Sequence, residues 1–100
     1  MFKRKRTRQI EDFGVALARD FAVRCPLGEV RQDTRKTVQL ARAVDDVCNR
    51  AAAYQREREL GMYGKAALGT SFKLELKALG YPGELIDDLT RQMLLTMSGK

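Results

Sequence analysis

The sequence predicts an all-α fold of about four helices, in a compact or elongated bundle with a long central helix and a basic amino-terminal arm. Apolar residues recur at spacings of three and four through most of the 100-residue chain, which is the period of helices that bury one face. No convincing stretch alternates apolar and polar residues as a strand would. The length suits one domain with one core. We therefore expect residues 1–8 to form a mobile arm and residues 9–100 a single helical domain.

The first helix is expected from about Arg8 to Arg24. Its apolar residues fall within one arc at 100° per residue, and they are Ile10, Phe13, Leu17 and Phe21. Pro26 followed by Gly28 ends this pattern, because the residue before a proline is biased away from helical geometry.

The second helix is expected to begin near Asp33 or Thr34, whose side-chain oxygens can cap free backbone amides. It continues without a breaker to Leu60, which makes it longer than the average helix of about 11–12 residues. Gly61 is expected to supply a left-handed cap. One face of the helix is formed by Leu40, Ala41, Val44, Val47, Cys48, Ala51 and Tyr54.

Two further helices follow, separated by the turn Tyr81-Pro82-Gly83. The third is expected to end at Gly80 and to bury Leu68, Phe72, Leu76 and Leu79. The fourth has acidic residues near its amino terminus, where they favour the helix dipole: Glu84, Asp87 and Asp88. Its apolar arc contains Leu85, Ile86, Leu89, Met93 and Met97.

The last helix is also apolar outside that arc, at Leu94 and Leu95. An exposed apolar patch often marks a partner surface. We expect Leu94, Leu95 and Met97 to contribute to an interface, with the long second helix giving a second face for a homodimer. The alternative is that Leu94 and Leu95 pack within their own chain.

Positive charge is concentrated at the amino terminus. The chain has a formal net charge of +6, from 19 basic and 13 acidic residues. Five of the basic residues lie within the first eight positions: Lys3, Arg4, Lys5, Arg6 and Arg8. The other residues are nearly balanced, with 14 basic and 13 acidic side chains. A run of like charges repels itself and does not fold into a core, so we expect it to contact an anionic partner.

Nucleic acid is the partner that this charge pattern favours. Basic side chains placed on phosphates release condensed counterions, which gives an attraction that depends on salt and not on base sequence. Arg31, Arg35 and Arg42 form a possible second basic stripe on the long helix, although Asp45 and Asp46 flank it. The alternative function is a protein-interaction module, an adaptor or assembly factor, that uses its apolar helix faces.

The composition argues against an enzyme and against a bound metal or cofactor. The chain has no histidine and only two cysteines, Cys25 and Cys48, whereas catalysis near neutral pH and zinc binding both favour histidine. The adjacent pairs Asp45-Asp46 and Asp87-Asp88 diverge by about 100° on a helix and do not face each other. The segment 61–65 lacks the spacing of a phosphate-binding loop and is interpreted as a helix connection.

Two other classes of binding are disfavoured. If residues 79–83 were the turn of a helix-turn-helix motif, the recognition helix after it would begin with acidic residues, which repel phosphates. A membrane-surface role needs a second anchor besides the basic run, and no lipidation signal or apolar span is evident. Without a secretory leader, the two cysteines favour a reducing, cytoplasmic location.

Overall fold

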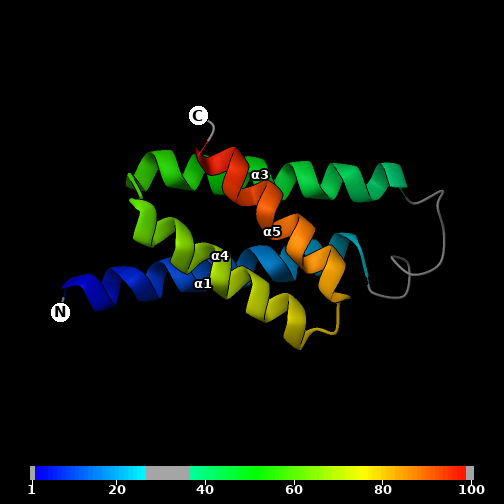
Figure 1. Ribbon diagram of the computed structural model, residues 1–100, viewed down its shortest axis with the longest axis horizontal. Helices are drawn as coiled ribbons and strands as arrows, with labels where there is room; N and C mark the ends of the chain where they lie inside the picture. Colours follow the sequence, from blue (N-terminus) through cyan, green and yellow to red (C-terminus); the bar gives the residue numbers. More distant parts are fainter. Residues whose placement is uncertain (1, 27–36, 99–100) are drawn as a thin grey trace.

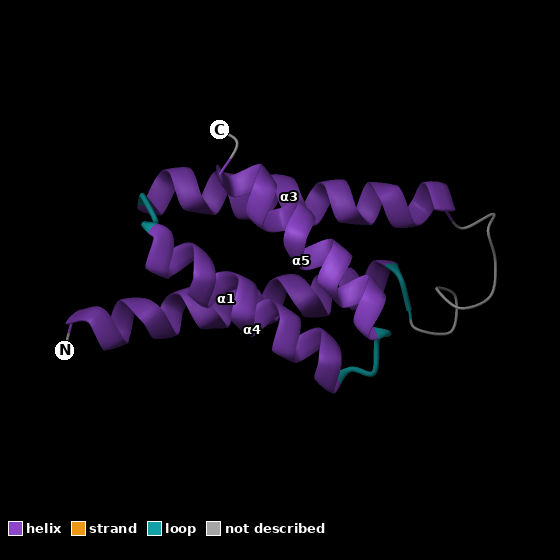
Figure 2. Cartoon of the chain, in the orientation of Figure 1, coloured by secondary structure: helices purple, strands orange, loops and turns teal. Residues whose placement is uncertain are grey.

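The described part of the chain consists of four α-helices (Figures 1 and 2). The computed structural model describes residues 2–26 and 37–98, with the backbone alone for residues 2–6 and 37–39. The helices are α1 (Phe2–Arg24), α3 (Thr37–Arg58), α4 (Met62–Ala78) and α5 (Gly83–Ser98). Neither described range contains a strand. The predictions of an all-α fold and of four helices are confirmed.

The helices form a flat bundle of 45 × 27 × 19 Å. α1 and α3 run along the long axis in opposite directions, and α4 and α5 cross them (Figure 1). α1 packs mainly against α4, α3 packs mainly against α5, and α4 and α5 pack against each other. The shortest dimension is close to twice a helix diameter of about 10 Å, so the bundle is two helices deep.

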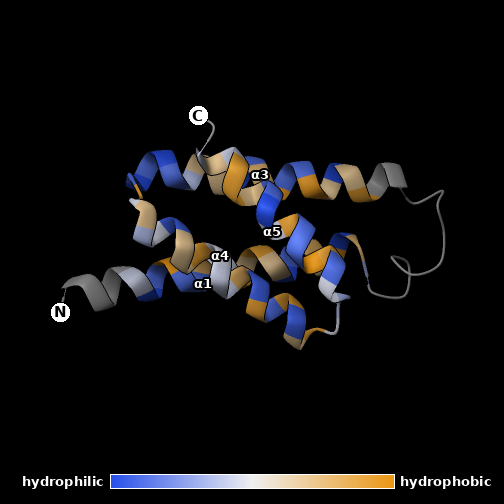
Figure 3. Ribbon diagram, viewed as in Figure 1, coloured by the Kyte–Doolittle hydropathy of each residue, from blue (hydrophilic) through white to orange (hydrophobic). Residues whose placement is uncertain are grey.

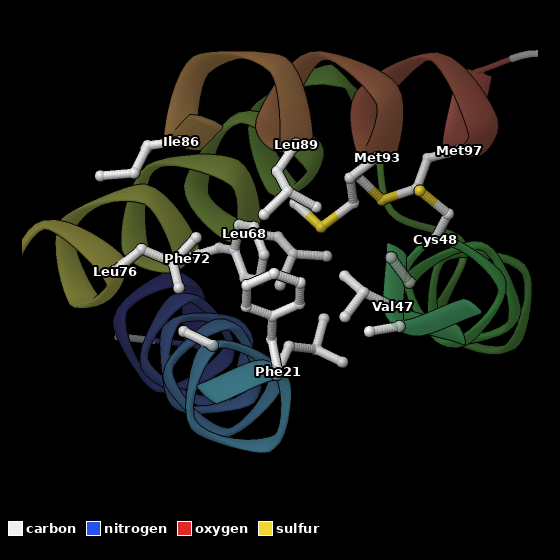
Figure 4. Packing of buried hydrophobic residues seen from close by; sticks show 14 of the residues in the cluster. Phe21, Val47, Cys48, Leu68, Phe72, Leu76, Ile86, Leu89, Met93 and Met97 are labelled. Atoms are coloured by element: carbon white, nitrogen blue, oxygen red, sulfur yellow. The ribbon is translucent and has the colours of Figure 1, made fainter. Parts of the chain in front are cut away.

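One core joins all four helices (Figure 4). α1 contributes residues that share one face of the helix, as its periodicity predicts: Ile10, Leu17, Ala18 and Phe21. The largest fully buried side chains of the other helices are Val47 from α3, three residues from α4 and two from α5: Leu68, Phe72, Leu76, Leu89 and Met93. Burial of this apolar surface is the main force that holds the helices together.

α1 and α4 cross at Gly14, where their backbones come close together. A Cβ atom added at Gly14 would lie 2.9 Å from the carbonyl oxygen of Leu68 and 3.1 Å from the amide nitrogen of Phe72. The side chain of Ser71, whose hydroxyl donates to the Leu68 carbonyl over 3.2 Å, occupies the remaining space. Only glycine fits at this crossing without a shift of the backbone.

Two helices end with the same pattern of backbone hydrogen bonds. At the end of α4, the amide of Tyr81 donates to the carbonyl of Leu76 and Gly80 adopts a φ of 94°. At the end of α3, the amide of Leu60 donates to the carbonyl of Gln55, and Glu59 adopts a φ of 51°. Both ends are Schellman motifs, in which one left-handed residue closes the helix.

The second of these ends corrects a prediction. Gly61 was expected to provide the left-handed cap of the long helix, but it has a φ of −78° and a ψ of −174° and instead caps the amino terminus of α4. The left-handed residue is Glu59, two positions earlier. Because α3 ends at Arg58 and the chain reverses at Glu59, Leu60 turns into the core, where it is buried.

Other boundaries also differ from the sequence expectation. α1 begins at Phe2, so the basic residues 3–8 continue this helix and a separate arm is not confirmed. A single long central helix is not confirmed either, since α1 has 23 residues and α3 has 22. Within α3, Ala41 was placed on the apolar face but is exposed, and Ala43 is buried in its stead.

Tyr81 ties the α4–α5 turn to the end of α1. Its hydroxyl donates a hydrogen bond of 2.6 Å to the carbonyl oxygen of Cys25. Its ring meets the ring of Phe21 edge to face, with centroids 5.7 Å apart. Burial raises the pKa of Tyr81 above its ordinary value of 10.0, which keeps the hydroxyl protonated and able to donate.

Candidate nucleic-acid interface

The structure separates the predicted nucleic-acid-binding residues into two places. Lys3, Arg4, Lys5 and Arg6 lie at the start of α1, followed by Arg8, which is exposed. Arg42 is exposed near the start of α3, at the opposite end of the long axis (Figure 1). Arg31 and Arg35 lie outside the described residues. The structure therefore does not bring Arg42 together with the residues of α1.

The start of α1, the end of α3 and the start of α4 lie at the same end of the bundle, and the first turns of α1 project beyond the other two (Figure 1). α1 approaches the α3–α4 connection at Ile10, because a Cβ added at Gly64 of α4 would lie 3.3 Å from Leu60 and 3.4 Å from Ile10. The last turns of α3 are hydrophilic (Figure 3). This arrangement brings Arg56, Arg58 and Lys65 to the same end as the basic start of α1.

We call residues 3–8 and 56–65 together the basic end. These two segments hold eight basic residues and two acidic ones, Glu57 and Glu59, which gives them a net charge of +6. The rest of the chain holds 11 basic and 11 acidic residues. The net charge of the whole protein thus equals that of the basic end. Glu11 and Asp12, both exposed, mark its boundary one turn farther along α1.

Several charged side chains elsewhere in the bundle neutralise one another in ion pairs. Arg50 lies 2.7 Å from Asp20 and 3.7 Å from Asp46, and so joins α3 to α1. Further pairs join Arg19 to Glu75 at 3.0 Å, Arg24 to Asp46 at 3.7 Å, and Lys73 to Asp87 at 3.2 Å. Such exposed pairs add little stability, about 0–1 kcal/mol each, but they leave less positive charge for an external anion.

Five basic side chains that the structure describes have no ion pair with another described side chain. Three of them lie in the basic end, Arg8, Arg56 and Lys65, and two lie elsewhere in the bundle, Arg42 and Lys77. Positive charges without a carboxylate partner are surrounded by solvent anions, and a phosphate can replace those anions at low cost. Most of the unpaired cations of the described side chains thus lie where the net charge is also highest.

A stack of side chains anchors the end of α3 to α1 beneath the basic end. The rings of Phe13 and Tyr54 are parallel to within 7°, with centroids 3.9 Å apart. The guanidinium carbon of Arg58 lies 5.3 Å from the centroid of the Tyr54 ring. Ring stacking and a cation–π contact both hold their members in fixed geometry. Arg58 is therefore positioned by the fold.

The cysteines occupy positions unsuited to nucleophilic chemistry. Cys25 and Cys48 are both free thiols, and both are buried. Burial raises the pKa of Cys48 above its ordinary value of 9.0, so the thiol stays protonated near neutral pH. Among residues 2–26 and 37–98, no three cysteine, histidine or carboxylate side chains are grouped as a metal site would require.

The predicted interface residues of α5 are only partly available. Leu94 packs against the core, and its Cδ2 would lie 3.2 Å from a Cβ added at Gly69. Met97 was expected in the interface but is only 2% exposed, because it belongs to the core beside Cys48 (Figure 4). Leu95 is 63% exposed. It lines an open pocket of about 320 Å³ with Lys73, Asp87, Thr90, Arg91, Leu94 and Ser98.

Sequence reasoning did not single out Arg56, Arg58, Lys65 or the exposed aromatic residue beside them, Tyr63. It compared residues 61–65 with a phosphate-binding loop and interpreted them as a helix connection. The available signal was the set of three basic residues that flank the expected α3–α4 connection. That signal becomes informative only when the connection is known to lie beside the start of α1.

None of the helices in the described ranges combines the length and the apolar character that a bilayer crossing requires. Comparison of the chain with protein-family models, with curated proteins and with solved structures gives no match.

Proposed function

We propose that this protein binds nucleic acid through its basic end, by contacts to the phosphate backbone. The observation that carries the proposal is the confinement of the net charge of +6 to residues 3–8 and 56–65, two segments that the fold brings to one end of the bundle. No catalytic step is part of the proposal.

The shape of the basic end favours contact with an extended polyanion. Among the side chains of α1 that the structure describes, which begin at Thr7, the first buried one is Ile10. The start of this helix extends beyond the adjacent ends of α3 and α4 (Figure 1). At 1.5 Å per residue, the helical residues before Ile10 span about 12 Å. A basic helical projection of this length can lie along several phosphates, and release of their counterions drives binding without regard to base sequence.

The alternative, a protein-interaction module or homodimer built on the apolar residues of α5, has less support. Of its three expected contact residues, Met97 is in the core and Leu94 is packed against the core, which leaves Leu95. Leu74 and Leu79 are exposed as well, but scattered exposed leucines are common on monomeric proteins and need no partner.

The proposal predicts a strong salt dependence of binding that arises from the basic end. In fluorescence-anisotropy titrations with a labelled oligonucleotide, affinity should fall steeply between about 50 and 200 mM salt. Replacing Lys3, Arg4, Lys5, Arg6 and Arg8 together by glutamine should weaken binding at low salt. On a single strand it should reduce the slope of log K against log salt by up to about 3.5, because each phosphate contact contributes about 0.7.

A matched control removes positive charge from the other part of the bundle. Lys77→Gln and Arg91→Gln alter two exposed residues of α4 and α5 and should leave the salt slope nearly unchanged. Circular dichroism should show that all variants keep their helical content. The proposal is refuted if the wild-type protein binds no oligonucleotide at about 50 mM salt, or if the control variants weaken binding as much, charge for charge, as the variant of α1.

A further inference from the structure

The turn between α3 and α4 presents two large apolar side chains to solvent. Met62 is 88% exposed and Tyr63 is 76% exposed, and both lie in the first turn of α4. The other two tyrosines have structural roles, since Tyr54 stacks on Phe13 and Tyr81 is buried against Phe21. Tyr63 has no such ring partner among the described side chains. Its ring is therefore available on the surface.

The surroundings of Tyr63 are basic. The last turn of α3 holds Arg56 and Arg58, Lys65 follows two residues after Tyr63, and the first turn of α4 contains no acidic residue. Glu57 and Glu59 are the acidic residues of this turn, so positive side chains outnumber negative ones from residue 56 to residue 65. The strongly basic start of α1 lies at the same end (Figure 1).

An exposed aromatic ring among basic side chains fits a nucleic acid whose bases are unpaired. The cations hold the phosphates, while the ring stacks on the face of a base. In a duplex both faces of every internal base are already covered by neighbouring base pairs, so the ring has nothing on which to stack. An aromatic residue within a basic surface thus distinguishes a single strand from a duplex of the same charge.

We propose that Tyr63 is a stacking platform for an unpaired base, and that the basic end therefore binds single-stranded nucleic acid in preference to duplex. This inference rests on the proposed function, because the phosphate contacts of the basic end bring the strand to Tyr63. Met62, exposed beside it, extends the apolar surface that the base covers. Cations of the basic end hold the phosphates of the neighbouring nucleotides.

The chain itself provides a sensitive test, because it contains no tryptophan. The variant Tyr63→Trp introduces one fluorophore at the proposed stacking position, and stacking of a base on an indole quenches its fluorescence. Titration with oligothymidylate should quench this signal, and titration with a duplex of equal length should not. Anisotropy of labelled oligonucleotides, measured in parallel, reports binding independently of the quenching.

Substitution at the same position gives the second measurement. Tyr63→Ala should weaken binding of the single strand by about 5- to 150-fold, the range found for loss of one base–aromatic stack, and should leave duplex binding unchanged. Tyr63→Phe should keep the wild-type affinity for the single strand. Leu95→Ala, which removes an apolar side chain of α5 that is also largely exposed, at 63%, is the matched control and should have no effect on either.

The two proposals fail in different ways. Equal affinity for single strand and duplex, with no loss in Tyr63→Ala, would overturn the stacking role of Tyr63 and leave phosphate binding by the basic end intact. Equal quenching of Tyr63→Trp by both oligonucleotides would also overturn it. Absence of binding to either oligonucleotide at low salt would overturn both proposals.

Discussion

Replacing Phe21 by alanine is expected to lower the free energy of unfolding by about 3–5 kcal/mol. Phe21 is 0% exposed and lies at the centre of the core that joins the four helices (Figure 4). Its ring also contacts Tyr81, whose hydroxyl holds the end of α1. The substitution removes the ring, leaves a cavity and loosens this link, so three effects act in the same direction. Urea denaturation followed by far-UV circular dichroism measures the change.

Phe13→Ala is the matched control for this prediction. Phe13 belongs to the same helix but is only half-buried, with its ring stacked on Tyr54 at the side of the bundle. Its loss should cost clearly less than the loss of Phe21. Phe21→Leu, which keeps most of the buried volume, should fall between Phe21→Ala and the wild type and remains measurable if Phe21→Ala does not fold. An equal or larger cost for Phe13→Ala would contradict the placement of the core.

Gly14→Ala should also destabilise the protein, although alanine favours an isolated helix by about 1 kcal/mol over glycine. The added methyl group would meet the backbone of α4 at Leu68 and Phe72 and the hydroxyl of Ser71. Backbone atoms cannot move away as a side chain can, so the helices must separate. Overpacking of this kind costs about 1–3 kcal/mol, and occasionally more. We expect a net loss of stability in the same denaturation assay.

The control for Gly14 is Gly83→Ala at the start of α5. A Cβ added at Gly83 meets no atom within 4 Å, so this variant should be as stable as the wild type or slightly more stable. If Gly14→Ala were as stable as Gly83→Ala, the close crossing of α1 and α4 would be wrong. Gly14→Val offers a stronger form of the same test, because its side chain is larger and is also disfavoured in helices.

The helices of this fold are largely predictable from the sequence because their apolar residues recur with the period of a helix. The spacing of Ile10, Leu17 and Phe21 identifies the buried face of α1. The same reasoning fails where neighbouring positions are similar in character. Ala41 is exposed and Ala43 is buried, although the two residues are identical and only two positions apart in α3.

Turns and close contacts were less predictable, because they depend on residues distant in sequence. Gly61 was the natural choice for a left-handed cap, but α3 ends earlier, at Arg58, and Glu59 takes the left-handed conformation that leads into the buried Leu60. Gly14 belongs to the apolar arc of α1, yet its need for glycine arises from the backbone of α4. Tyr81 was assigned only to a turn, and nothing local indicated that its hydroxyl reaches Cys25, 56 residues away.

The candidate site also combines features that the local sequence reveals with features that depend on residues distant in sequence. The basic residues 3–8 were evident as a local run of charge. Arg56, Lys65 and Tyr63 were not, because nothing local indicates that the α3–α4 turn lies beside the start of α1. The fold therefore converts two separate segments into one surface, and it places Arg42 away from them.

The most direct test of nucleic-acid binding by the basic end is to map the contact surface residue by residue. In a titration of isotopically labelled protein with oligothymidylate at low salt, we expect the largest changes in backbone amide NMR shifts at residues 3–8 and 56–65. Residues at the α4–α5 turn and around Leu95 should change little. Largest changes around Leu95 and the adjoining pocket, or no changes at any concentration, would contradict the account.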